Sequence, residues 1–142
     1  MLIGTYSHQL DQKNRFRIPA KFKQALGEDI IITRGNGKQL FLFAGCDMQR
    51  LVIDKAENIS LFDEVGQKSV RLLLSSSFEL EQDNQGRVLL PTELKNFAGI
   101  TKDIVSIGVG SRVEIWAKEE WEAYSKVAEV DKELSNLKDY GV

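Results

Sequence analysis

Alternating hydrophobic and polar positions divide the chain into two similar series of short elements. Apolar and polar residues alternate over Thr5 to Leu10 and again over Arg15 to Ile18, with the polar turn QKN between them. This alternation predicts a β-hairpin, because successive side chains of a strand point to opposite faces. Phe78 to Gln82 and Arg87 to Leu90, around the turn NQG, predict a second hairpin.

A short helix is predicted after each hairpin. Pro19 and Pro91 stand where a helix would begin, since proline loses no hydrogen bond at a first helical position. Gly27 and Gly99 stand where it would end.

Each half then continues with two apolar runs separated by a Gly-rich turn. Ile30 to Thr33 with Leu40 to Phe43, and Ile104 to Ile107 with Val113 to Trp116, predict a further hairpin in each half. A helix is expected after each of these hairpins, and the sequence GNGK at 35–38 is interpreted as a turn.

The two series repeat the same residue types at an offset of 72. The shared pattern is D-x-x-x-R-Φ-x-Φ-P-x-x-Φ, and it aligns Asp11, Arg15, Pro19, Lys23 and Gly27 with Asp83, Arg87, Pro91, Lys95 and Gly99. A match at so many positions in order indicates duplication of one supersecondary unit. We therefore expect an α+β fold of tandem β-hairpin and short-helix units.

The expected organisation places a helix between the repeats and another after them. We predict a first repeat over 1–54, a connecting helix over 55–77, a second repeat over 78–125 and a C-terminal helix or tail over 126–142. Leu61, Val65, Leu72 and Leu73 fall at helical spacings, which favours a helix over a flexible linker and implies that the halves pack together.

Composition excludes several classes of protein. No apolar run approaches the roughly 20 residues that span a bilayer, and no leader-like segment opens the chain, so neither a membrane location nor export is expected. With one histidine, His8, and one cysteine, Cys46, no metal site, cofactor or catalytic set can be assembled. We expect a non-enzyme without a small-molecule substrate, and Cys46 as a packing residue.

Charge is distributed unevenly although the net charge is only −2. The stretch from Lys13 to Lys23 carries five basic residues and no acid, whereas residues 114–139 are rich in Glu and Asp. Charges more than about 10 Å apart are largely screened, so a local basic surface can exist on an acidic protein. Such a surface is typical of nucleic-acid binding.

The repeated D-x-x-x-R motif has two interpretations. Asp11 and Asp83 suit a turn-organising role, because a short carboxylate accepts hydrogen bonds from nearby turn amides. Arg15 and Arg87 could pair with those aspartates or project toward a phosphate or a guanine edge. The double occurrence and the flanking basic residues favour the second interpretation.

The stretches DQKNRFRIPAKF and DNQGRVLLPTEL, with VEIWAKEEWEAY near the end, resemble the MraZ family of bacterial transcriptional regulators over essentially the whole chain. The resemblance implies an AbrB-like, double-split β-barrel fold and assembly into a ring homo-oligomer. It also implies binding of double-stranded DNA, through the basic hairpins, at repeated promoter sites of the division and cell-wall gene cluster. A cytoplasmic, nucleoid-associated location goes with that function.

Carried onto this sequence, the resemblance implies DNA contacts by Lys13, Arg15, Arg17 and Arg87. The first hairpin is expected to dominate affinity, because acidic residues surround the second. The alternative is a ring-forming scaffold in which the Asp–Arg pairs only close turns and the hairpins bind protein. The sequence does not determine the bases of the DNA site, the number of subunits in the ring, or whether the protein activates or represses transcription.

Overall fold

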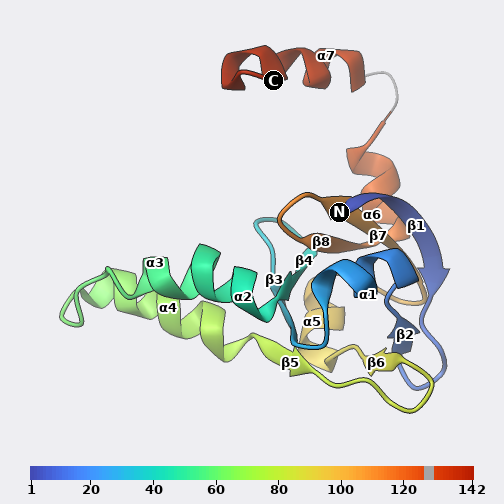
Figure 1. Ribbon diagram of the computed structural model, residues 1–142, viewed down its shortest axis with the longest axis horizontal. Helices are drawn as coiled ribbons and strands as arrows, with labels where there is room; N and C mark the ends of the chain where they lie inside the picture. Colours follow the sequence, from blue (N-terminus) through green and yellow to red (C-terminus); the bar gives the residue numbers. More distant parts are fainter. Residues whose placement is uncertain (127–129) are drawn as a thin grey trace.

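The computed structural model describes residues 1–126 and 130–142, and it contains two β-sheets and several short helices (Figure 1). The strands are β1 (Ile3–Gln9), β2 (Arg15–Arg17), β3 (Ile30–Arg34), β4 (Leu40–Ala44), β5 (Phe78–Leu80), β6 (Arg87–Leu89), β7 (Asp103–Val109) and β8 (Val113–Ala117). The helices are α1 (Ala20–Leu26), α2 (Gly45–Met48), the π-helical η1 (Gln49–Ile53), α3 (Asp54–Ala56), α4 (Glu64–Ser75), α5 (Thr92–Phe97), α6 (Lys118–Tyr124), α7 (Val130–Ser135) and the 3₁₀ helix η3 (Asn136–Tyr140). The predicted α+β class is confirmed.

The strands form a six-stranded antiparallel sheet in the order β1-β7-β8-β4-β3-β5 and a separate antiparallel pair, β2-β6. The order strand, strand, helix, strand, strand, helix occurs twice along the chain, first from β1 to α2 and again from β5 to α6. The large sheet interleaves the two series, because β7 and β8 lie between β1 and β4.

The predicted pairing of the first two strands in each half is wrong. β1 pairs with β7, β5 pairs with β3, and β2 pairs with β6 of the other half. Around the turn of the second predicted hairpin, the described residues keep an isolated bridge between Gln82 and Val88 and a hydrogen bond from the Asp83 N–H to the Arg87 carbonyl. The reason is length: β7 offers β1 seven paired positions, whereas β2 could offer only three.

The other local predictions are confirmed. β3 pairs with β4, and β7 pairs with β8, as two further hairpins. Helix α1 follows Pro19 and ends at Gly27, whose φ of +82° suits glycine. Helix α5 follows Pro91 and ends shortly before Gly99.

Helix α4 lies within residues 55–77, the segment predicted as a connecting helix between the repeats. Helix α4 begins after Asp63, whose side chain caps the Gly66 N–H at 2.9 Å. Together with α2, η1 and α3 it forms a helical arm, Gly45–Ser75, that projects from the sheets (Figure 1). Val65 and Leu72 of α4 are 81% and 63% exposed, so this face of the helix does not pack between the halves.

The halves are instead held together by strand pairing and a shared core. The β2–β6 and β4–β8 pairs join the halves directly. Equivalent positions of the repeat are buried in one cluster, namely Phe16 with Val88, Ile18 with Leu90, and Phe22 with Leu94. Full burial of such side chains contributes about 1.5–3 kcal/mol each, and both halves supply side chains to this one cluster.

A second, smaller cluster lies under α6. Val105, Ile107 and Trp116 are buried there, with Trp121 packed against them. The ring centroids of Trp116 and Trp121 are 5.3 Å apart, as is typical of edge-to-face aromatic pairs. Trp116 and Trp121 therefore pack within this cluster.

The C-terminal segment predicted over 126–142 contains α7 and η3 (Figure 1). Residues 127–129 of that segment lie outside the described part of the chain. Among the described residues, no helix has the length and apolar character that crossing a membrane requires.

Candidate nucleic-acid interface

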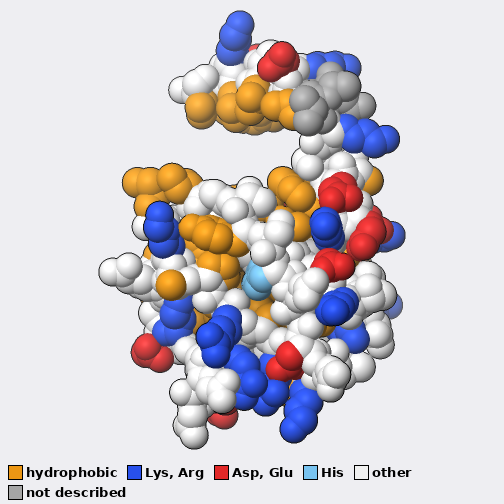
Figure 2. Space-filling view, turned by 90° about the vertical axis from the view of Figure 1, so that its right-hand side faces the viewer, with side chains coloured by type: hydrophobic (Ala, Val, Ile, Leu, Met, Phe, Trp, Pro, Cys, Tyr) orange, Lys and Arg blue, Asp and Glu red, His pale blue; other side chains and the backbone are white. Residues whose placement is uncertain are grey.

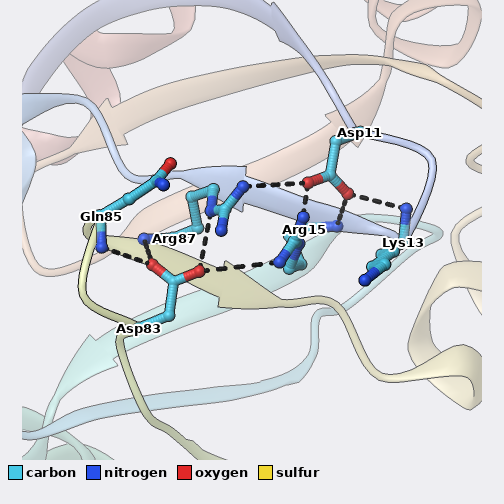
Figure 3. Close-up of polar contacts among 6 residues, drawn as sticks. All are labelled: Asp11, Lys13, Arg15, Asp83, Gln85 and Arg87. Carbon is cyan, nitrogen blue, oxygen red and sulfur yellow. Dashed lines mark hydrogen bonds and ion pairs between the residues drawn. The ribbon is translucent and has the colours of Figure 1, made fainter.

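Two equivalent turns, each organised by an aspartate, form the centre of the candidate site (Figure 3). Asp11 Oδ1 accepts hydrogen bonds from the backbone N–H groups of Lys13 and Arg15, both at 2.9 Å. Asp83 Oδ1 accepts from Gln85 and Arg87 at the same distances. The repeated D-x-x-x-R spacing therefore builds the same turn twice.

Each turn also needs one residue with a positive φ. This residue is Asn14, at φ +60°, in the first turn and Gly86, at +75°, in the second. Asparagine and glycine are the residues that most readily adopt this conformation. The backbone closes through the Asp11 N–H donating to the Arg15 carbonyl at 2.8 Å, and through Asp83 to Arg87 at 2.9 Å.

The four charged side chains of the two motifs meet in one cluster. Arg15 Nε donates to Asp11 Oδ2 at 2.8 Å, and Arg87 Nε donates to Asp83 Oδ2 at 2.7 Å. Each arginine also approaches the aspartate of the other half, at 3.9 Å for Arg15 to Asp83 and 3.8 Å for Arg87 to Asp11. The cluster thus joins the two halves at the surface (Figure 3).

Hydrogen bonding shifts the acidity of both aspartates. The Arg15 backbone N–H is the main cause that lowers the pKa of Asp11, and the Arg15 side chain adds to the effect. The Arg87 backbone N–H does the same to the pKa of Asp83. Both carboxylates therefore remain charged well into the acidic range.

The β2–β6 pair presents most of the predicted site residues on its outer face. Phe16 and Val88 are directly opposite each other and point into the core. The outward positions pair Arg15 with Leu89 and Arg17 with Arg87. We call these four residues the ribbon face. It consists of three arginines and one leucine.

Arg17 differs from the other two arginines. It is exposed and has no salt-bridge partner among the described residues. Its cross-strand neighbour is Arg87, and like charges directly opposite each other destabilise a strand pair. A nearby anion would relieve this repulsion.

The structure brings together all four residues predicted to contact DNA. Lys13 is exposed in the first turn, next to the ribbon face that carries the three arginines. Lys and Arg side chains gather at the lower end of the molecular face shown in Figure 2, at the level of β2 and its turn in Figure 1.

Two further residues were not identified from the sequence. Lys95 Nζ donates to Asn14 Oδ1 at 3.0 Å, so a lysine of the second half supports the first turn. Leu89 lies on the ribbon face beside Arg15. Lys23 does not join them, because its Nζ binds the Gly27 carbonyl and Glu28. Neither Lys95 nor Leu89 could be identified without knowing how the strands of the two halves pair.

Other candidate groups have local structural roles. His8 Nε2 lies 2.7 Å from Ser106 Oγ, and burial lowers the pKa of the imidazole. Ser76 Oγ donates to the Leu72 and Leu73 carbonyls at the C-terminal end of α4. No cluster of three or more metal-binding side chains occurs among the described residues.

The expectation that Cys46 is a packing residue is wrong. Its side chain is exposed near the start of α2. The neighbouring positions Ala44 and Met48 are buried instead, so Cys46 falls on the outer side of this turn of helix.

An α+β fold with a cationic two-stranded ribbon is the class of structure these observations define. The chain matches, over residues 1–63 and 73–138, the family described as "MraZ protein, putative antitoxin-like". The chain therefore belongs to the MraZ family, and the resemblance noted from the repeated motifs is confirmed.

Curated relatives named "Transcriptional regulator MraZ" are similar over nearly the whole chain. The protein of Clostridium beijerinckii is 43% identical over 143 residues, which cover 100% of each chain. That of Caldanaerobacter subterraneus subsp. tengcongensis is 42% identical, covering 92% of this chain and 90% of its own. That of Clostridium tetani is 42% identical, covering 88% and 87%. The names are those of regulators and not of enzymes, so the expectation of a non-enzyme is confirmed.

Proposed function

We propose that this protein is a DNA-binding transcriptional regulator that contacts double-stranded DNA through the ribbon face and the turn before it. The observation that carries the proposal is the gathering of Arg15, Arg17 and Arg87 on one two-stranded ribbon. The major groove of B-DNA admits a two-stranded β-ribbon, and arginine suits both phosphate oxygens and guanine edges. The names of the relatives support the same function.

The contacts divide into two kinds. Lys13 and Arg17 are exposed and serve as phosphate contacts, which supply affinity without reading sequence. Arg15 and Arg87 are held by Asp11 and Asp83 through Nε, and Nη1 of each approaches the aspartate of the other half, which leaves Nη2 of each for base edges or phosphates. The aspartates thus pre-orient two guanidinium groups before DNA arrives.

The proposed architecture is a duplicated unit that forms an AbrB-like, double-split β-barrel. Its support is the twice-repeated element order and the β2–β6 pair, to which each half contributes one strand. Equivalent core positions in the two halves are filled by equivalent apolar residues, as duplication would require.

We propose further that the regulator acts as a ring homo-oligomer. The helical arm exposes large apolar side chains, namely Leu61, Phe62, Val65 and Leu72. Several large apolar side chains exposed on one projecting element are typical of a protein interface. Linking several ribbons in one assembly makes later DNA contacts intramolecular, which raises affinity by about 10² to 10⁴ for correctly spaced repeats. Repeated promoter sites of the division and cell-wall gene cluster are the proposed target, and a cytoplasmic, nucleoid-associated location follows.

The rival function is a ring-forming scaffold without specific DNA binding. The observation in its favour is that both motif arginines already have aspartate partners. Under this hypothesis the cluster serves only to join the halves, and the ribbon binds protein.

Fluorescence anisotropy tests the two hypotheses. The purified protein is titrated with duplexes carrying one or several copies of the repeated sequence upstream of its own gene, with scrambled duplexes as controls, at two salt concentrations. Repeat-dependent, salt-sensitive binding supports the regulator, and equal weak binding to every duplex supports the scaffold.

Replacing a ribbon-face arginine by glutamate then tests whether this surface binds DNA. Arg15→Glu would also place a third carboxylate beside Asp11 and Asp83, so Arg17→Glu is the cleaner variant. Loss of DNA binding with unchanged molar mass in size-exclusion chromatography with light scattering excludes the scaffold. Loss of assembly with unchanged DNA binding excludes the proposed interface.

A further inference from the structure

Leu89 is an exposed apolar side chain on a surface that is otherwise cationic. It is 58% exposed at the end of β6, directly opposite Arg15 on β2. The other large hydrophobic side chains exposed among the described residues lie at the N-terminus, on the helical arm, at the end of β7, or from α6 to the C-terminus. Exposed leucines are common in proteins, so its neighbours, and not its exposure, make Leu89 informative.

The two ends of the ribbon face are chemically different. Positions 17 and 89 are equivalent in the repeat, as are positions 15 and 87. The first half has Arg17 where the second half has Leu89, so one end pairs Arg17 with Arg87 and the other pairs Arg15 with Leu89. A ribbon with a near-symmetric backbone therefore presents an asymmetric surface.

We propose that Leu89 is a specificity-determining residue that contacts the C5-methyl group of thymine in the major groove. This inference rests on the proposed DNA-binding function. The methyl group of thymine is the apolar feature of the major-groove edge, and apolar side chains contact it in sequence-specific complexes. Leu89 is exposed on the same face as Arg15, whose guanidinium is held by Asp11 and Asp83, so both side chains would face the same groove.

Asymmetry of the ribbon sets an expectation for the DNA. The β6 end requires a thymine, whereas the Arg17 end attracts phosphate or a base with acceptor atoms. Each site bound by one protomer should therefore be non-palindromic.

The experiment compares thymine with uracil, which lacks the methyl group. Duplexes carrying the repeats upstream of the protein's own gene are synthesised with thymidine or with deoxyuridine throughout. Binding of the full chain to both is measured by fluorescence anisotropy, and the ratio of the two Kd values is recorded. The variants are Leu89→Ala and, as the matched control, Val109→Ala, which shortens an exposed side chain at the end of β7.

The wild-type protein should bind thymidine DNA more tightly by about fourfold for each methyl group that Leu89 covers, since burying a methyl-sized group is worth about 0.8 kcal/mol. Leu89→Ala should lower this ratio toward one, and Val109→Ala should leave it at the wild-type value. A ratio that is the same in Leu89→Ala and wild type overturns the inference.

The design separates failure of this inference from failure of the proposed function. If the wild-type protein prefers its promoter to scrambled DNA but shows no thymine dependence, the role of Leu89 is excluded and the regulator stands. If it shows no promoter preference, the proposed function itself fails. Leu89→Gln provides a second variant, because a glutamine at this exposed position leaves the core untouched.

Discussion

Replacement of Arg17 by glutamine separates DNA binding from stability at a single position. Arg17 is exposed, has no salt-bridge partner among the described residues and faces Arg87 across the ribbon. The variant keeps Phe16 in the core and leaves the Asp–Arg cluster intact. The free energy of unfolding should therefore change by no more than about 0.5 kcal/mol, as at other surface positions.

The effect on DNA binding follows from counterion release. Each phosphate contact contributes about 0.9 to the slope of log K against log salt concentration. Losing the Arg17 contact should thus lower the slope by about 0.9 per bound protomer. If the variant and wild type bind equally at 1 M salt, this difference in slope corresponds to an affinity loss of about eightfold per protomer at 0.1 M salt.

Anisotropy titrations at several salt concentrations, with urea unfolding in parallel, measure both quantities. Arg71→Gln is the matched control, since it removes the same charge from an exposed position on α4. Parallel salt dependences for Arg17→Gln and wild type would show that Arg17 contacts no phosphate. A large loss of stability would show that the ribbon face is structural.

Three further predictions concern stability. Because hydrogen bonds lower the pKa of Asp11 and Asp83, the stabilisation by each carboxylate is fully present above the ordinary value of about 4 and is lost as pH falls through the lowered pKa. The thermal unfolding temperature should therefore fall more steeply between neutral and strongly acidic pH in wild type than in the Asp11→Asn/Asp83→Asn double variant. Equal falls in the two proteins would contradict this. Phe22→Ala should lower the free energy of unfolding by about 3–5 kcal/mol in urea titrations, because Phe22 is fully buried; a loss below about 1 kcal/mol would refute its place in the core. Gly108→Ala should destabilise the fold in thermal melts, because its Cβ would collide with the backbone at the start of β1, whereas Gly110→Ala meets no atoms within 4 Å and provides a control for backbone strain.

The sequence by itself determined the local structure and the residue types of the candidate site. Helix α1 begins after Pro19 and ends at Gly27, because the conformational preferences of proline and glycine act on their own backbone dihedral angles. Asp11 reaches the Arg15 amide four residues away, so the D-x-x-x-R turns could also be predicted from the sequence. Repetition of the motif identified the family before any spatial relation was known.

Only the tertiary structure decided which strands pair. β1 and β2 were predicted to form a hairpin, yet each pairs with a strand of the other half. An alternating pattern predicts which side of a strand is buried, but it does not predict which strand pairs with it. Any strand of similar length that buries the same face of the sheet can supply the hydrogen bonds. The ribbon face, the two-halved Asp–Arg cluster and the place of Leu89 all depend on that choice of partner. They arise from contacts between residues about 70 positions apart, and no local preference in the chain encodes them.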